Sequence, residues 1–273
     1  MPRIIQETMK TEPSHIRLEK FGFNHERGSA HMARTMMLSE LRQLLDSVPA
    51  SSASSNVYVR AIEEHNCLGK RSSRTRTLTR RHLADLYVLR PDTTLFRTLR
   101  FFWQRDPEGR PLIACLCAYA RDPLLRGSAP FVLKLTDGQV FSRKALENHL
   151  EKEYPGRFSK ATLTSTAQNL ASTWTQTGHL TGRVKKIRSR ATATAGSTAY
   201  ALFLGFLTGE RGESLFKTDY AKLLDCSFER AVELAETGSR KGWIVFKRVG
   251  NVIEVLFPAL LTEQETEWIR EQG

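Results

Sequence analysis

The 273-residue chain carries 41 lysine and arginine residues against 29 aspartate and glutamate residues, a formal net charge of +12. Such a surplus favours an anionic partner, either nucleic acid or a membrane surface, although it can also serve solubility alone. The longest apolar run, Ala199–Leu207, is about half the roughly 20 residues that a membrane-spanning helix needs. The N-terminus also lacks a charged-then-apolar signal peptide. We therefore expect a soluble, cytoplasmic, bacterial protein with no membrane partner.

Residues 1–30 lack sustained periodicity and predict an N-terminal arm that orders only against the body or a partner. Apolar spacing after this arm predicts a series of helices. These helices cover residues 31–48, 57–65, 77–88, 94–104 and 112–120. The last two carry apolar residues on most faces, which predicts that they form the centre of the core. Residues 31–135 are thus a predicted helical domain with a basic helix-turn-helix-like segment.

The pattern changes after Thr136-Asp137-Gly138. Ser142 precedes a helix that closes before Pro155, and Ser159 precedes a second helix, residues 160–175, with apolar residues spaced three or four apart. The basic, partly β-branched stretch 181–190 suits a short hairpin. Two helices followed by a hairpin is the order of a winged helix, so residues 136–195 are predicted to form a central winged-helix-like unit.

The same order recurs near the C-terminus. Short helices are predicted over residues 218–224 and 227–237, and strand 242–248 is predicted to pair with 252–257 across a Gly-Asn turn. Residues 196–273 are thus a predicted C-terminal winged-helix unit. The expected fold class is mainly α: a helical bundle with winged helix-turn-helix units and short β-hairpin wings.

Charge is concentrated in the central unit, because no Asp or Glu occurs from Tyr154 to Gly209. Missing carboxylates matter as much as cations, since one carboxylate near a phosphate cancels part of the attraction. Helix 160–175 has a polar face of Thr, Ser, Gln and Asn, types that contact base edges and phosphates in the major groove. An ordinary solvated face is the alternative. The predicted DNA contacts of this unit are Lys160, Gln168, Asn169, Arg183, Lys185, Lys186, Arg188 and Arg190.

A second cationic run precedes and enters helix 77–88, with no acid between His65 and Ala84. Serine and threonine hydroxyls alternate with its arginines, which suits a loop and helix N-terminus set against a nucleic-acid backbone. A charged loop that merely solvates the fold is the alternative. The predicted contacts here are Lys70, Arg71, Arg74, Arg76, Arg80 and Arg81. The C-terminal unit differs: Glu229, Glu233 and Glu236 would repel phosphates, so we expect a structural or protein-contact role for it.

No pattern in the chain indicates an enzyme. The sequence has no P-loop, G-x-G-x-x-G, H-x-H or HExxH motif, and no Asp or Glu has a Lys two positions later, as restriction-type nucleases require. The Arg121-Asp122 pair, followed by Pro123, indicates a capped helix end rather than a catalytic pair. The four cysteines form no C-x-x-C pair, which favours free thiols in a reducing compartment over zinc. We expect no catalytic residues, metal, cofactor or small-molecule substrate.

One segment resembles a known family. The stretch Asn66–Ser72 (NCLGKRS), followed by Arg74, Thr75 and a Leu83-x-x-Leu86-Tyr87 helix, resembles the small BrxA-type component of bacteriophage-exclusion (BREX) defence systems. The resemblance implies a helical fold with helix-turn-helix elements. It also implies a DNA-binding accessory role, with other proteins of a phage-defence complex as partners. No functional residue is carried over from it.

The leading hypothesis is sequence-tolerant binding of double-stranded DNA through the central wing and the Lys70–Arg81 run. RNA binding is an alternative, but the basic segments lack the interleaved aromatic residues that stack exposed bases. An interaction scaffold whose basic faces meet acidic proteins is another. A transcriptional regulator is a further variant and would require a preferred operator and a dimer.

Overall fold

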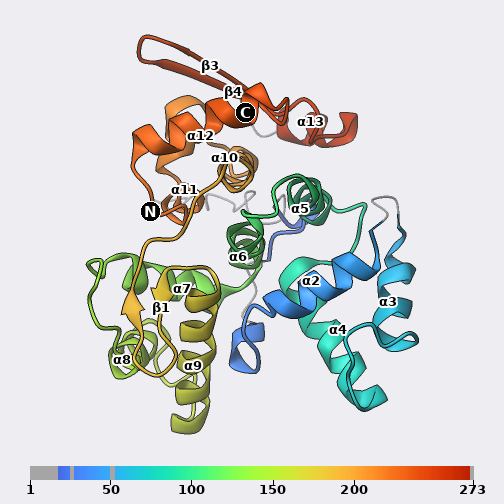
Figure 1. The fold of residues 1–273 in the computed structure, drawn as a ribbon, viewed down its shortest axis with the longest axis vertical. Helices are drawn as coiled ribbons and strands as arrows, with labels where there is room; N and C mark the ends of the chain where they lie inside the picture. The colour runs from blue at the N-terminus through green and yellow to red at the C-terminus, as the bar shows by residue number, and fades with distance from the viewer. Residues whose placement is uncertain (1–17, 25–27, 50–52, 271–273) are drawn as a thin grey trace, which may run out of the picture.

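The computed structural model describes residues 18–24, 28–49 and 53–270 and is mainly helical, as the sequence predicts, with two short antiparallel hairpins (Figure 1). The first elements are η1 (Ala30–Met32), α2 (Leu38–Ser47), α3 (Ser55–Glu63), α4 (Ser73–Tyr87), α5 (Thr94–Arg105), α6 (Arg110–Arg121) and α7 (Pro123–Leu133). The next are α8 (Arg143–Glu153), α9 (Lys160–Gln176), β1 (Leu180–Thr181), β2 (Ile187–Arg188) and α10 (Ala195–Leu207). The last are η2 (Gly212–Lys217), α11 (Asp219–Lys222), α12 (Phe228–Arg240), β3 (Val245–Val249), β4 (Val252–Leu256) and α13 (Glu263–Arg270).

The core is built around α5, α6 and α10. Every residue of α6 from Leu112 to Ala120 is buried, which confirms the prediction that this segment and α5 form the centre. Helix α10 packs against α5 and α6 on one side and against α11 and α12 on the other (Figure 1). The Tyr200 hydroxyl of α10 donates to the Leu95 carbonyl oxygen of α5 at 3.0 Å. No helix among the described residues combines the length and apolar character needed to cross a bilayer.

Helix α7 lies outside the predicted helices, and it contains Pro123 and Gly127, which are residue types typical of loops. Pro123 occupies the first helical position, where an N–H has no intrahelical partner to lose. Asp122 caps this helix, and its carboxylate accepts hydrogen bonds from the amides of Leu124 and Leu125 at 3.0 Å. The expectation of a capped helix end at the Arg121-Asp122 pair is therefore confirmed.

The first predicted helix begins later than expected, at Leu38 rather than His31. Residues 29–37, which we call the strap, include the short η1 turn and then run in an irregular path along the side of α9. The last residue but one of the strap and the first residue of α2 donate backbone hydrogen bonds to side chains of α9. The Met36 amide donates to the Thr173 hydroxyl at 2.9 Å, and the Leu38 amide donates to the Gln176 side chain at 3.4 Å. Tertiary hydrogen bonds have thus overridden the local apolar periodicity.

Two helices followed by a hairpin occur twice, as predicted. In the first case α8 and α9 precede the β1–β2 pair, and Val140, just before α8, forms an isolated bridge with Ile187 of β2. In the second case α11 and α12 precede β3 and β4, which pair antiparallel from Val245↔Leu256 to Val249↔Val252. The division into units 31–135, 136–195 and 196–273 stays a prediction. Most of the predicted arm, residues 1–17 and 25–27, lies outside the described residues.

Candidate nucleic-acid interface

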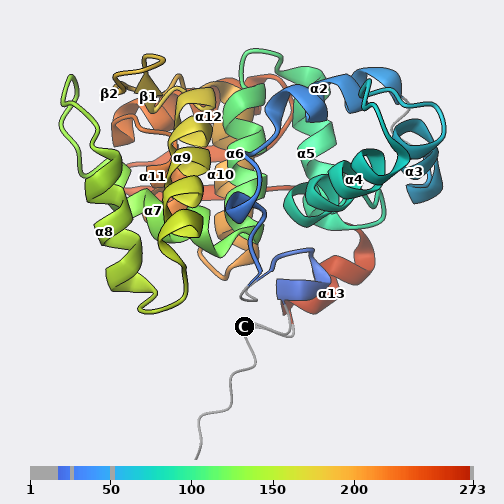
Figure 2. The ribbon, with the colours of Figure 1, turned by 90° about the horizontal axis from the view of Figure 1, so that it is seen from below.

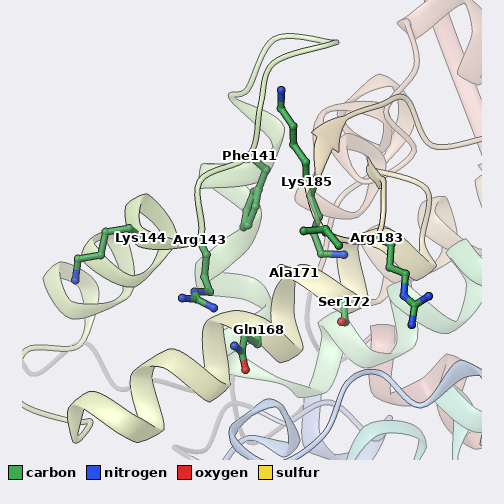
Figure 3. A pocket seen from close by; sticks show the side chains of 10 residues that line it. Phe141, Arg143, Lys144, Gln168, Ala171, Ser172, Arg183 and Lys185 are labelled. Atoms are coloured by element: carbon green, nitrogen blue, oxygen red, sulfur yellow. The ribbon is translucent and has the colours of Figure 1, made fainter.

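A groove with a volume of about 560 Å³ lies between the start of α8, the middle of α9 and the loop that joins β1 to β2 (Figure 3). Ten residues line it: Phe141, Arg143, Lys144, Gln168, Ala171, Ser172, Arg183, Val184, Lys185 and Lys186. Five of these residues are cationic and none is acidic. The structure thus brings together several of the predicted contacts of the central unit and adds two cations that the sequence analysis missed.

The added cations, Arg143 and Lys144, form the wall of the groove on the α8 side. Both follow Ser142, whose hydroxyl accepts from the Ala145 amide and so fixes the start of the helix. Both also lie near Glu147, at 3.3 Å from Arg143 and 3.4 Å from Lys144. Their side chains stay 51% and 73% exposed. The signal in the sequence was a serine cap followed by two cations in a first turn without any acid.

The opposite wall is the loop 182–186 between β1 and β2. Gly182 has a φ of +93°, and a Cβ placed there would lie 2.1 Å from the Lys185 carbonyl oxygen, so the tight turn requires glycine. Arg183 and Lys185 are exposed, and Val184 between them is 97% exposed. Figure 3 shows Arg183 and Lys185 reaching out from this loop. The loop therefore presents two cations to solvent on a constrained backbone.

Lys186 is a weaker candidate than its neighbours. Its ammonium group donates to the Thr175 hydroxyl at 2.8 Å and to the Gly182 carbonyl oxygen at 3.4 Å. Burial lowers the pKa of Lys186 below its ordinary value. This side chain thus helps to hold the loop against α9 as well as lining the groove.

The prediction that Arg188 contacts DNA does not fit its position. Its side chain is only 2% exposed, and its guanidinium forms two 2.7 Å hydrogen bonds with the Asp225 carboxylate. Arg190 also pairs with Asp225, at 3.0 Å, but stays exposed. Burial by itself raises the pKa of Asp225, but hydrogen bonds from Arg188 and the Ala191 amide outweigh it and lower that pKa. Arg188 fixes the hairpin to the loop after α11, because a buried charge must be paired inside the protein.

The predicted contacts on α9 divide in a similar way. Lys160 is exposed in the first turn, after the Ser159 cap, and Gln168 is exposed in the groove. Asn169 is instead directed at the strap, where its side-chain amide donates to the His31 carbonyl oxygen at 3.0 Å. Asn169 therefore has a structural partner, which differs from the contact predicted for it.

The strap is held by a buried group of polar side chains. One imidazole nitrogen of His31 lies 2.9 Å from the Asp122 carboxylate, and the other lies 3.0 Å from the Thr173 hydroxyl. Burial alone raises the pKa of Asp122, but the charge on His31 and hydrogen bonds from His31, Leu125 and Ser29 hold it at about 2. The order acid, imidazole, hydroxyl is that of a hydrolase triad. Here the hydroxyl is fully buried and already accepts from the Met36 amide, so the group joins the strap to α7 and α9.

The second cationic run lies apart from the groove, on the other side of α6 from α8 and α9, both in Figure 1 and from below in Figure 2. Helix α4 begins at Ser73, four residues earlier than predicted, and Ser72 caps it by accepting from the Thr75 amide. Two of the six cations are paired within the protein: Lys70 with Glu40 at 3.1 Å and Arg80 with Glu63 at 2.5 Å. Arg76 is partly buried, and the exposed cations are Arg71, Arg74 and Arg81.

Other reactive groups are buried. Cys115 and Cys117 lie in the core on α6, and burial raises the pKa of both thiols to about 12, which suppresses the nucleophilic thiolate. Among the residues that the structure describes, no three His, Cys, Asp or Glu side chains are grouped as a metal site would need. On α12, Glu229, Glu233 and Glu236 are exposed, as expected, and Arg230 pairs with Glu233 at 2.8 Å.

No family model matches this chain, and no curated protein matches it. The resemblance of the Asn66–Ser72 segment to a BREX component therefore stays an expectation from the sequence.

Proposed function

We propose that this protein binds double-stranded DNA through the groove between α8, α9 and the 182–186 loop, without catalysing a reaction. The observation that carries the proposal is the composition of the groove. Its two walls supply five cations from separate elements, and a helix with a polar face lies between them. Cationic walls suit phosphates on either side of a helix lying in a major groove.

The order of elements supports a winged-helix interpretation of this region. Helix α7, the bridging residue Val140, α8, α9, β1 and β2 follow one another along the chain. The Gly138 amide donates to the Arg188 carbonyl oxygen of β2, and the Phe141 amide donates to the Lys186 carbonyl oxygen just before β2, so residues 138–141 lie beside the hairpin. In this interpretation α9 is the recognition helix and the 182–186 loop is the wing, which matches the helix-turn-helix mode of DNA binding.

Duplex DNA is favoured over single-stranded RNA because the groove offers little surface for base stacking. Phe141 is the one aromatic residue among the ten that line the groove, and it is only 7% exposed. Proteins that bind single strands normally stack exposed bases on aromatic rings. The exposed Arg71, Arg74 and Arg81 at α4 provide a second cationic surface that is free to contact the DNA backbone.

The biological role that we propose is that of a cytoplasmic accessory protein in a multi-protein phage-defence system. This part rests on the resemblance of the Asn66–Ser72 segment. The C-terminal unit is a candidate surface for protein partners, since its helix α12 carries exposed glutamates where a DNA-binding helix would carry cations. An interaction scaffold or a transcriptional regulator stands as the alternative role.

The test is a fluorescence-anisotropy titration of a labelled duplex at several salt concentrations, with unlabelled RNA as competitor. The double variant Arg183→Gln/Lys185→Gln removes two groove cations and leaves the buried Arg188 intact. If both cations contact phosphates, the slope of log K against log salt decreases in magnitude by about 1.8.

The matched control is Lys217→Gln/Lys222→Gln. It removes the same charge from two side chains that are 70% and 61% exposed and remote in sequence from the groove. We expect the slope of this control to equal that of the wild type. Absence of wild-type binding at low salt, preference for the RNA competitor, or equal effects of the two double variants would each overturn the proposal.

A further inference from the structure

We propose that the floor of the groove reads base edges, with Gln168 recognising the adenine of an A·T pair, so that binding is sequence-selective as well as electrostatic. This inference rests on the proposed DNA binding and deepens it. The sequence alone favoured sequence-tolerant binding. The placement of individual side chains in the groove changes that expectation.

Charged groups and neutral hydrogen-bonding groups come from different elements of the groove. Helix α9 has 17 residues, and Lys160 at its start is its one charged residue. In the groove this helix contributes Gln168, Ala171 and Ser172, whereas all five cations come from α8 and the 182–186 loop. Figure 3 shows Gln168 between the two cationic walls. Cations contact every phosphate alike, but an amide distinguishes base edges by their donors and acceptors.

Two polar side chains of α9 in the groove keep unused hydrogen-bonding groups. Asn169 donates to His31, Thr173 bonds with the strap, and Gln176 bonds with Thr35 at 3.2 Å. In contrast, neither the Gln168 amide nor the Ser172 hydroxyl has a hydrogen-bond partner among the described residues. These two residues are four apart on one helix face, and both face the groove. The strap thus engages Asn169, Thr173 and Gln176, whereas the polar groups of Gln168 and Ser172 in the groove are available to a ligand.

Helix α9 is preorganised by contacts outside the groove. The strap bonds to Asn169, Thr173 and Gln176 on the neighbouring face of this helix. Lys186 ties the 182–186 loop to Thr175 on the same helix at 2.8 Å. A helix held in this way keeps the backbone positions of Gln168 and Ser172 fixed relative to the cationic walls. Discrimination between bases depends on such fixed geometry, because a glutamine must approach adenine N6 and N7 with both ends of its amide.

The experiment is selection of preferred duplexes from a randomised pool by the full-length protein, followed by affinity measurements on the selected duplex. We expect a preferred site containing a required adenine. Replacing that adenine with 7-deazaadenine, which removes the N7 acceptor, should weaken wild-type binding about 5- to 150-fold. The same replacement should change the affinity of Gln168→Ala by less than about twofold, because the reading group is already absent.

The control variant is Lys185→Gln, which removes one cation from the wall and leaves the floor intact. We expect it to reduce the magnitude of the salt slope by about 0.9 while keeping the sensitivity to 7-deazaadenine. Gln168→Ala should keep the wild-type salt slope and lose the sensitivity to 7-deazaadenine. Because Gln168 is exposed, its variant should keep the wild-type melting temperature, which separates a reading role from a folding defect.

The failures of the two proposals are distinguishable. Salt-dependent wild-type binding with equal affinity for all sequences would refute base reading and leave the DNA-binding function standing. Retention of the full preference by Gln168→Ala would show that another group reads the base, which also refutes the assignment. Absence of any DNA binding would refute the proposed function, and the reading of bases with it.

Discussion

Removing the Asp225 carboxylate should destabilise the protein far more than removing an equally close but exposed carboxylate. The side chain of Asp225 is 4% exposed and holds the 2%-exposed Arg188 through two 2.7 Å hydrogen bonds. It also accepts from Arg190 at 3.0 Å and from the Ala191 amide at 3.1 Å. In Asp225→Ala the Arg188 guanidinium stays buried without a counter-charge. Breaking a buried pair in this way costs about 3–5 kcal/mol.

The matched comparison is Glu233→Ala on α12. Glu233 lies 2.8 Å from Arg230, nearly the same separation, but both side chains are more than half exposed. Solvent screens such a pair, and its loss costs about 0.2–1 kcal/mol. Urea unfolding followed by circular dichroism gives both free energies of unfolding. If the two variants lose similar stability, burial does not decide the strength of the pair and the reasoning is refuted.

Three further predictions concern single residues. Burial lowers the pKa of His179 from 6.5 to about 4, so roughly 3 kcal/mol of folding stability is lost as the pH falls from about 6.5 to about 4. The free energy of unfolding, plotted against pH, should be flatter in His179→Gln, and an unchanged curve would contradict this. Gly182→Ala should cost about 1–3 kcal/mol and weaken DNA binding, because its Cβ overlaps the Lys185 carbonyl oxygen; a neutral effect in urea unfolding would show that the turn relaxes. The buried thiols of Cys115 and Cys117 should react with a thiol reagent only in denaturant, and labelling of either in the native protein, mapped by mass spectrometry, would disprove it.

The sequence predicted the fold best where local signals and tertiary packing agree. The β3–β4 hairpin follows from alternation and a Gly-Asn turn, and α5 and α6 follow from apolar residues on most faces. The prediction failed where local signals and tertiary packing differ. Residues 31–37 have helical spacing, but the Met36 amide donates to Thr173 of α9. Proline is typical of loops, but Pro123 occupies the first position of α7, where proline also fits.

The candidate site shows the same limit. A cluster of cations can be read from the sequence, but which ones face solvent depends on partners far away in the chain. Arg188 is buried because of Asp225, and Asn169 turns to the strap because of His31. Arg143 and Lys144 enter the groove because α8 packs against α9. The pairings of Arg188 with Asp225 and of Asn169 with His31 have no local sequence signal, so only the three-dimensional structure separates side chains that are available from those that are engaged.

Helix α10 packs between α5 and α6 on one side and α11 and α12 on the other, and this position has a consequence for synthesis. The apolar surfaces of α5 and α6 leave the ribosome early, but the helix that covers them follows only after α7, α8, α9 and the first hairpin. Until then the nascent chain exposes surface that associates readily with other unfinished chains. Shortened forms that end before Ala195 should therefore aggregate, and a chaperone that shields α5 and α6 during this interval would raise the yield of folded protein.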